Sequence, residues 1–264
     1  MLKGVIHLHS THSDGERTLK ELRQQFLRAG CSFACITDHA EAFDTESLRC
    51  YIAECDEYSD ERFLFIPGLE YECERRMHIL GLGMLGLLRT RDPMDVIQEI
   101  ERLECISVIA HPSDAMFNWI ETFEVLPCGI EVWNTKYDGQ YAPRPGTFRL
   151  LVRLQQRQPK LLAFYGQDFH WKRQYSKMFS WVWTDALDRG AILQSLLSAQ
   201  YHASTDRYHL PSNGAISQSQ LAQFEGLHQR SRWIRTCVET AHKAVRRTGV
   251  KVPNSIKARV RGIF

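Results

Sequence analysis

The chain has 264 residues, 44% of them hydrophobic and 24% charged, which is typical of a soluble globular protein of one barrel-sized domain or two smaller ones. The net charge is +2, but residues 240–264 carry seven Lys and Arg and no acidic residue, which leaves the rest of the chain at about −5 and excludes a generally basic protein. No apolar run approaches the length that crosses a bilayer, so we expect no membrane span.

Apolar runs of strand length alternate with amphipathic stretches of helical spacing from the N-terminus onward. The predicted strands are 5–9, 32–39, 63–71, 78–84, 106–112, 129–134, 161–170 and 181–185. The predicted helices are 18–30, 45–58, 92–104, 148–158 and 192–200. Helix ends carry recognisable signals: Gly30 stops the first helix, Thr45 is the expected N-cap of the second, and Asp92 precedes Pro93 at the third.

This alternation predicts an α/β fold with a largely parallel sheet. Seven or eight strand–helix units in about 200 residues fit a barrel better than a doubly wound open sheet, because polar residues end too many strands to meet at one switch point. Residues 218–248 read as helix without a strand. We therefore divide the chain into a barrel, 1–215, and a C-terminal helical segment with a basic tail, 216–264.

Nine potential metal ligands occur in the first two-thirds of the chain, nearly all beside a predicted strand. They are His7 and His9 (VIHLHS), Asp14 (HSDG), His39 (ITDHA), Glu70 (IPGLEY), His78 (MHILGLG), His111 (VIAHPS), and Asp168 and His170 (YGQDFH). Alternate residues of a strand point to one face, so we expect His7 and His9 to reach one ion. A closed sheet would bring strand ends together, and this set therefore predicts a polynuclear metal centre.

In this order, the motifs HxH, SDG, TDH, GxE, HxLG, AHP and DxH resemble the metal motif of the PHP (polymerase and histidinol phosphatase) family, and the resemblance covers about residues 1–210. It implies a distorted (βα)7 TIM-like barrel with a trinuclear centre of zinc, manganese or iron. By the family's pattern, one ion would be held by His7, His9, Glu70 and Asp168, a second by Glu70, His78 and His111, and a third by Asp14, His39 and His170.

The resemblance also implies a hydrolytic reaction, in which a hydroxide bridging two ions attacks phosphorus in line while the ions hold the phosphate oxygens. We assign three residues of the set to catalysis: Asp168 to orient the hydroxide, and His170 or His39 to assist the leaving oxygen. The set contains no thiolate, which suits two to three divalent ions of Zn, Mn or Fe.

Residues outside the ligand set supply candidates for supporting roles. We interpret Asp38 either as an acid that steadies a ligand or as a helix cap. Lys136, Arg144 and Arg75, with Arg76 as a rival, are candidates to bind a phosphate or carboxylate of the substrate. The loop 135–147 is rich in turn-forming residues and reads as functional. The aromatic residues Trp133, Tyr137 and Tyr141 could stack on a substrate ring or pack in the core, and His12 lies close enough to the ligand motifs to touch substrate.

The leading hypothesis is a phosphoesterase that hydrolyses a phosphomonoester of a small metabolite or nucleotide. One alternative is a nuclease or oligonucleotide exonuclease that binds single-stranded nucleic acid, in part through the basic tail. Another is a catalytically silent PHP module that serves only in binding. Eight cysteines without a CxxC pair and a first strand without a preceding signal-peptide pattern favour a cytoplasmic location.

Overall fold

The computed structural model describes residues 1–174, 176–230 and 233. Its ten strands form one sheet in the order β10-β9-β8-β1-β2-β3-β4-β5-β6-β7. The strands are β1 (Leu2–Leu8), β2 (Phe33–His39), β3 (Leu64–Glu72), β4 (His78–Leu82), β5 (Ile106–Ala110), β6 (Gly129–Asn134), β7 (Leu162–Gly166), β8 (Phe179–Val182), β9 (Tyr201–Ser204) and β10 (His209–Pro211). The sequence predicted eight of these strands, and missed the short β9 and β10.

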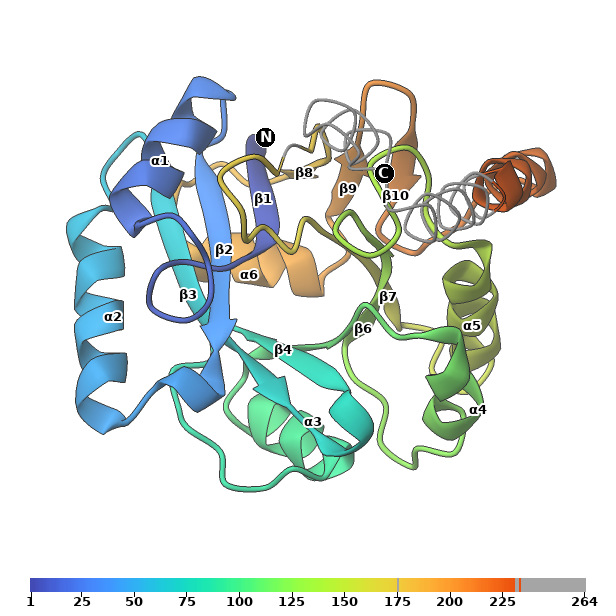
Figure 1. Ribbon diagram of the computed structural model, residues 1–264, viewed down its shortest axis with the longest axis horizontal. Helices are drawn as coiled ribbons and strands as arrows, with labels where there is room; N and C mark the ends of the chain where they lie inside the picture. Colours follow the sequence, from blue (N-terminus) through green and yellow to red (C-terminus); the bar gives the residue numbers. More distant parts are fainter. Residues whose placement is uncertain (175, 231–232, 234–264) are drawn as a thin grey trace, which may run out of the picture.

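Strands β1 to β7 curl into a nearly closed barrel, which confirms the predicted fold class (Figure 1). The chain just after β7 closes the ring against β1. There, Gln167 N donates to Ile6 O at 2.9 Å, His9 N donates to Phe169 O at 2.9 Å, and Leu8 and Phe169 form a parallel bridge. Strands β8, β9 and β10 continue the sheet from the first half of β1, where Gly4 pairs with Ser180. The seven-strand ring agrees with the barrel that the resemblance implies.

The expectation of a largely parallel sheet is wrong in one part of the barrel. Strands β1, β2 and β3 pair in parallel, as do β5, β6 and β7. Strand β4, however, is antiparallel to both β3 and β5. The physical reason is the short connection after Glu72, which leaves no room for a crossover helix. As a consequence, the first residue of β4, His78, lies at the same edge of the barrel as the last residues of β3.

The helices lie outside the barrel, with α1 and α2 along one side and α4 and α5 along another (Figure 1). They are α1 (Leu19–Arg28), α2 (Thr45–Glu57), α3 (Pro93–Arg102), α4 (Phe117–Ile120), α5 (Pro145–Gln155) and α6 (Arg189–Leu197), with short 3-10 turns at Ala40–Ala42, Glu74–Arg76 and Asp114–Met116. Buried apolar side chains of α1, namely Leu19, Leu22 and Phe26, show the helical spacing that predicted it.

Three helix starts differ from the prediction. The N-cap of α2 is Asp44 and not Thr45, because the Asp44 carboxylate accepts from Ser47 N at 2.8 Å in a capping box. Helix α5 begins at Pro145, inside the segment predicted as loop, because proline suits the first helical turn. Helix α6 begins at Arg189 and not at 192, because Asp188 caps it. All three corrections concern helix ends, where the same few residue types can occupy neighbouring positions.

Residues 218–230 are helical, in agreement with the first part of the predicted C-terminal helix. Phe224 is fully buried and stacks on Phe148 of α5 with ring centroids 6.0 Å apart, and it also meets the ring of Tyr208. The start of the C-terminal segment is therefore packed on the barrel. The remainder of the predicted helix and the basic tail 240–264 lie outside the described residues. No helix in the described part of the chain is long and apolar enough to cross a membrane.

Candidate metal centre

All nine predicted ligands gather at one end of the barrel. They come from the C-terminal ends of β1, β2 and β3, from the start of the antiparallel β4, and from the segments that follow β1, β5 and β7. Their ligand atoms form four overlapping groups, in each of which all atoms lie within 4.8 Å of one another. The groups are His9, Asp14, His39 and His170; His7, His9 and Asp168; His7, Glu70 and His111; and His39, Glu70 and His78.

Glu70 is the hub of the arrangement. Its Oε2 atom lies 3.4 Å from His7 Nε2, 3.1 Å from His9 Nε2 and 3.5 Å from His39 Nδ1. Its Oε1 atom lies 2.8 Å from His78 Nδ1 and 3.0 Å from His111 Nε2. The carboxylate is 1% exposed. A single buried carboxylate with five imidazoles around it could serve as a shared ligand for divalent cations.

Asp14 marks the open side of the centre. Its Oδ1 atom lies 3.2 Å from His170 Nε2, 3.5 Å from His9 Nδ1 and 3.6 Å from His39 Nε2. Its side chain is 54% exposed, in contrast to the buried His7, His9 and Asp168. The Asp14 group is therefore the part of the centre that solvent and a substrate reach first.

Three of the nine residues hold a left-handed backbone. The φ angles are 67° at His7, 29° at His111 and 48° at Asp168. Residues other than glycine rarely adopt such angles, and surroundings that impose them are frequent at functional sites. At His7 the conformation accompanies a β-bulge in the pairing of β1 with β2. His7 and His9 do share one group with Asp168, as expected. The reason is not simple strand alternation, because β1 has a bulge at His7 and His9 lies beyond the strand.

Glu131 is a functional candidate that the sequence interpretation missed. Its Oε1 atom lies 2.8 Å from His7 Nδ1, and its Oε2 atom accepts from His111 N at 2.9 Å and from Asn134 Nδ2 at 2.9 Å. This carboxylate orients the His7 ring and leaves Nε2 facing the centre. A Cβ atom on Gly166 would approach Glu131 Oε1 to 1.7 Å, so the neighbouring strand must carry glycine there. The available signal was an acidic residue inside the apolar run GIEVWN.

Asp38 supports the loop that carries Asp14. Its carboxylate accepts from Ser10 N at 2.8 Å, from Ser10 Oγ at 2.7 Å and from the Ser13 hydroxyl. Asp38 is fully buried, and the turn that follows it has no side-chain cap. Of the two predicted roles, the contacts support the first: Asp38 steadies the segment between His9 and Asp14. It does not cap the turn that follows it.

The protonation pattern follows from burial and charge. Burial alone would lower the pKa of His7, but Glu131, Asp168 and Glu70 outweigh it and raise that pKa well above its usual value. Burial would raise the pKa of Glu70, yet the surrounding histidines hold it well below its usual range. Burial would likewise raise the pKa of Asp168, but the nearby histidines hold it well below its usual range. Burial lowers the pKa of His9, which favours the neutral imidazole that ligates metals.

The residues fit a group of divalent cations. Nine buried side-chain nitrogen or oxygen atoms in the described part of the chain lack a hydrogen-bond partner, and four of them are here: His7 Nε2, His9 Nδ1, His9 Nε2 and Glu70 Oε2. Buried polar atoms are normally satisfied, and such a concentration of exceptions in one place indicates a missing partner. Lone pairs of imidazole and carboxylate, without thiolate, match Zn²⁺, Mn²⁺ or Fe²⁺.

The three predicted substrate-binding cations have different positions. Lys136 Nζ enters the centre, 3.2 Å from Asp168 Oδ1 and 3.1 Å from His170 Nε2. Arg144 pairs with the buried Asp138, whose pKa is raised by burial although Arg144 opposes the rise, and with Asp114 at 3.8 Å. Arg75 stacks over the ring of Trp119 at 4.4 Å and is exposed. Of these three cations, Lys136 is the one with contacts to the nine candidate ligands.

The aromatic candidates and His12 also differ in their surroundings. Trp133 is fully buried, and its Nε1 atom donates to Gly139 O at 2.8 Å, so it is a core residue. The ring of Tyr137 lies on the His111 ring with centroids 4.5 Å apart. Burial and the carboxylates of the centre raise the pKa of Tyr137 to about 12. His12, predicted as a neighbour of the centre, instead pairs with Glu54 of α2 at 2.7 Å.

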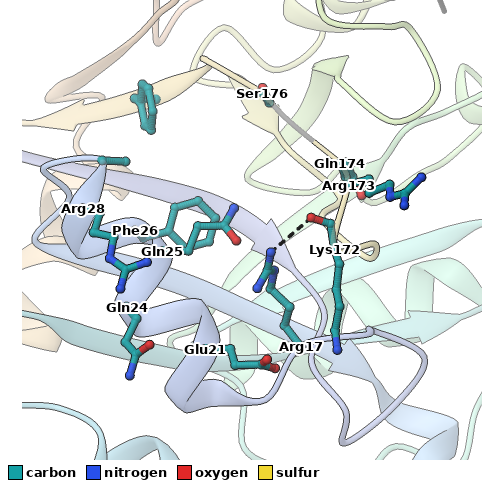
Figure 2. Close-up of a pocket in the computed structure, with 12 residues that line it drawn as sticks. Arg17, Glu21, Gln24, Gln25, Phe26, Arg28, Lys172, Arg173, Gln174 and Ser176 are labelled. Carbon is teal, nitrogen blue, oxygen red and sulfur yellow. Dashed lines mark hydrogen bonds between the residues drawn. The ribbon is translucent and has the colours of Figure 1, made fainter. Parts of the chain in front are cut away.

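A basic groove of about 620 Å³ lies between α1 and a wall that includes Lys172, Arg173, Gln174 and Ser176 (Figure 2). Four basic side chains, Arg17, Arg28, Lys172 and Arg173, line it with one acidic residue, Glu21. Hydrogen bonds join the segments that follow Asp14 and His170: Glu16 N donates to His170 O at 2.7 Å, and Arg17 donates to Lys172 O at 3.1 Å. The groove is thus lined in part by residues close in sequence to two candidate ligands.

Comparisons with known proteins agree with the fold. No protein-family model matches the chain. It is similar to the DNA polymerase/3'-5' exonuclease PolX of Bacillus subtilis, with 30% identity over 79 residues, which are 27% of this chain and 14% of that protein. It also resembles a two-domain protein of Bacteroides vulgatus that contains a predicted PHP-like metal-dependent phosphoesterase (TM-score 0.56, 16% identity, 79% of this chain and 66% of that one).

A third similar protein is an amidohydrolase of Chromobacterium violaceum, with TM-score 0.50 and 16% identity over 75% of this chain and 96% of that one. The chain thus spans less than two-thirds of the length of PolX and of the Bacteroides protein. At these identities the structural similarity establishes a common fold. The resemblance to PHP domains that the motifs predicted is therefore confirmed at the level of the barrel.

Proposed function

We propose that this chain is a metal-dependent phosphoesterase of the PHP type that hydrolyses a phosphomonoester of a small metabolite or nucleotide. The observation that carries the proposal is the convergence of nine imidazole and carboxylate side chains, with four unsatisfied buried atoms, at the mouth of a PHP-like barrel. His7, His9, Glu70, His78, His111 and Asp168 would hold ions in the buried part, and Asp14, His39 and His170 would hold one at the open side.

When bound, the two to three ions would lower the pKa of a coordinated water and neutralise the phosphate charge. The protein's own residues supply the rest. The Asp168 carboxylate, oriented by Asn134 Nδ2 at 3.2 Å, is placed to hold the attacking oxygen. Lys136, whose ammonium lies beside Asp168 and His170, is placed to bind a non-bridging phosphate oxygen as charge develops there.

Proton transfer to the leaving oxygen falls to His170 or His39. Both border the exposed Asp14 group, through which the leaving alcohol would depart. His39 is 24% exposed and His170 only 3%, so His39 has easier exchange of protons with solvent. We therefore favour His39 as the proton donor, in which case Asp14 and His170 would hold the ion at the open side without it.

The proposal is tested on purified protein reconstituted separately with Mn²⁺, Fe²⁺ and Zn²⁺. Its substrates are an aryl phosphate, histidinol phosphate, nucleotides and short oligonucleotides, and elemental analysis is made of the same samples. We expect two to three ions per chain and release of inorganic phosphate from a monoester. Full metal occupancy without phosphate release from any monoester contradicts the assignment, and absence of bound metal supports the silent module.

The basic groove favours a nuclease as the second candidate. A phosphodiester chain with its reacting phosphate at the centre would place neighbouring phosphates near Arg17 and Lys172, and the name of the PolX relative includes an exonuclease. The test is binding of single-stranded oligonucleotide at several salt concentrations to Arg17→Ala and Lys172→Ala. Lys20→Ala, three residues after Arg17 on α1 but outside the groove lining, is the control. Equal affinities for all variants contradict this candidate, and deletion of 240–264 tests the tail separately.

A further inference from the structure

Two large aromatic rings stand half-exposed at the edge of the metal centre. Tyr137, in the loop after β6, and Trp171, in the segment after β7, are each 48% exposed. Burying such rings is favourable, and exposed aromatic side chains that border a polar site commonly bind a ligand.

Each ring rests on a different imidazole of the candidate ligand set. The Tyr137 ring lies 4.5 Å from the His111 ring, at an interplanar angle of 40°. The Trp171 ring lies 5.9 Å from the His170 ring, at 43°. His111 belongs to the group around Glu70, and His170 belongs to the group around Asp14. The two rings therefore border the centre at two separate places.

The ammonium of Lys136 lies near both rings. Its Nζ atom is 5.3 Å from the centroid of the Tyr137 ring and 5.6 Å from that of the Trp171 ring. The same atom is 3.2 Å from Asp168 Oδ1. A phosphate bound by Lys136 would therefore lie near both rings, within reach of a planar group on its ester.

We propose that Tyr137 and Trp171 form an aromatic rim that stacks on a planar ring of the substrate, so that the preferred substrates are phosphomonoesters that carry a nucleobase. This inference rests on the proposed phosphoesterase activity and narrows its substrate class. Lys136 binds the phosphate, and the aromatic rim stacks on the base. Stacking of one base on an aromatic side chain changes affinity by between about fivefold and a hundredfold, enough to set a preference.

Two substrates isolate the contribution of the base: adenosine 5′-monophosphate, and ribose 5-phosphate, which has the same sugar phosphate without the base. We expect wild-type kcat/KM to be higher for the nucleotide. Tyr137→Ala and Trp171→Ala should each reduce that value about fivefold to a hundredfold through KM, and leave hydrolysis of ribose 5-phosphate unchanged. Trp171→Phe should retain most of the preference, since it keeps a stacking face.

Matched controls exist for both variants. Tyr141 lies in the same loop as Tyr137 with the same 48% exposure, and Trp183 is 49% exposed beside His202, on the sheet extension. Tyr141→Ala and Trp183→Ala should leave the preference intact. The rim is wrong if its variants lose kcat/KM equally on both substrates. It is also wrong if the wild-type enzyme does not distinguish the two substrates.

Calorimetric binding of the same two compounds to the metal-loaded protein separates this inference from the proposed function. If neither these compounds nor any other monoester is hydrolysed, but the nucleotide binds more tightly and the rim variants abolish the difference, the activity proposal fails and the rim stands. If both are hydrolysed at equal kcat/KM and bind equally, the activity proposal stands and the rim is wrong.

Discussion

Two groups of histidines in this molecule differ in what surrounds them. In the metal centre, six imidazoles share the carboxylates of Asp14, Glu70 and Asp168. On β9 and β10, His202 and His209 lie with ring centroids 5.7 Å apart, and the rings of Trp181 and Trp183 lie 6.4 and 4.9 Å from His202. In the described part of the chain neither of these two imidazoles pairs with a carboxylate.

The contrast shows that clustered imidazoles do not by themselves make a cation site. Burial and the neighbouring His209 lower the pKa of His202, and no opposing charge compensates in the described residues. At the centre, three carboxylates hold the pKa of His7 well above its usual value. The left-handed backbone at His7, His111 and Asp168 also has no counterpart on β9 and β10. We expect function to follow the carboxylates and the constrained backbone.

The largest effect should come from Glu70→Gln. The change removes the negative charge that five imidazoles share, so we expect loss of bound metal and a fall in kcat of about a thousandfold or more. The measurement is elemental analysis together with phosphatase kinetics. The double variant His202→Ala with His209→Ala is the control and should keep both properties. If both proteins lose metal and activity to the same extent, the distinction between the two histidine groups is wrong.

Lys136→Ala should reduce activity by about a hundredfold. From sequence, Lys136 is a candidate to bind substrate, and a lysine that does so remotely from the reacting phosphate would affect KM more than kcat. Its Nζ atom lies 3.2 Å from Asp168 Oδ1, so we now expect kcat to fall as well. Steady-state kinetics with a monoester shows whether KM alone or also kcat changes. Arg207→Ala, beside β10, is the control for the loss of one positive charge. A change in KM alone would return Lys136 to the remote role.

Glu131→Gln should weaken metal binding by about tenfold to a hundredfold, because this carboxylate orients His7 without facing the centre. The measurement is a metal titration with a competing chelator. Excess metal should restore most of the activity, which distinguishes an orienting residue from a ligand. Activity that excess metal fails to restore would place Glu131 in the chemistry itself.

Removal of metal should lower the melting temperature by about 10 °C, since ions that bind only the folded state stabilise it by mass action. The comparison is a thermal melt with and without chelator. The Glu70→Gln protein should show little response to the chelator. A wild-type melt that the chelator leaves unchanged would indicate that the centre holds no ion in solution.

The smallest effect should come from Asp188→Ala, which removes the N-cap of α6. The Asp188 carboxylate accepts from Ala191 N at 2.9 Å. We expect a loss of about 1 kcal/mol of unfolding free energy and unchanged metal content and kcat. Chemical denaturation and elemental analysis measure both. Loss of metal in this variant would show that the centre responds to general destabilisation, and would weaken every interpretation above.

The sequence determined which residue types the centre contains and which strands carry them. Strand periodicity and the polar residues at strand ends were sufficient to predict the barrel and to collect all nine candidates, from His7 to His170. Ligand types and their order depend on local chemistry, which a linear pattern records directly. Helices α1, α2, α3, α5 and α6 were predicted for the same reason, within a few residues at their ends, whereas the four-residue α4 was missed.

Tertiary structure alone decided how these residues meet. The antiparallel direction of β4 places His78 beside Glu70, and a bulge with a left-handed His7 aims that imidazole. Packing also brings Glu131, Asn134 and Lys136 against the ligands, and separates Tyr137 from the buried Trp133. These outcomes depend on contacts between residues distant in sequence, such as His7 with Glu131, whose energies outweigh local strand and rotamer preferences.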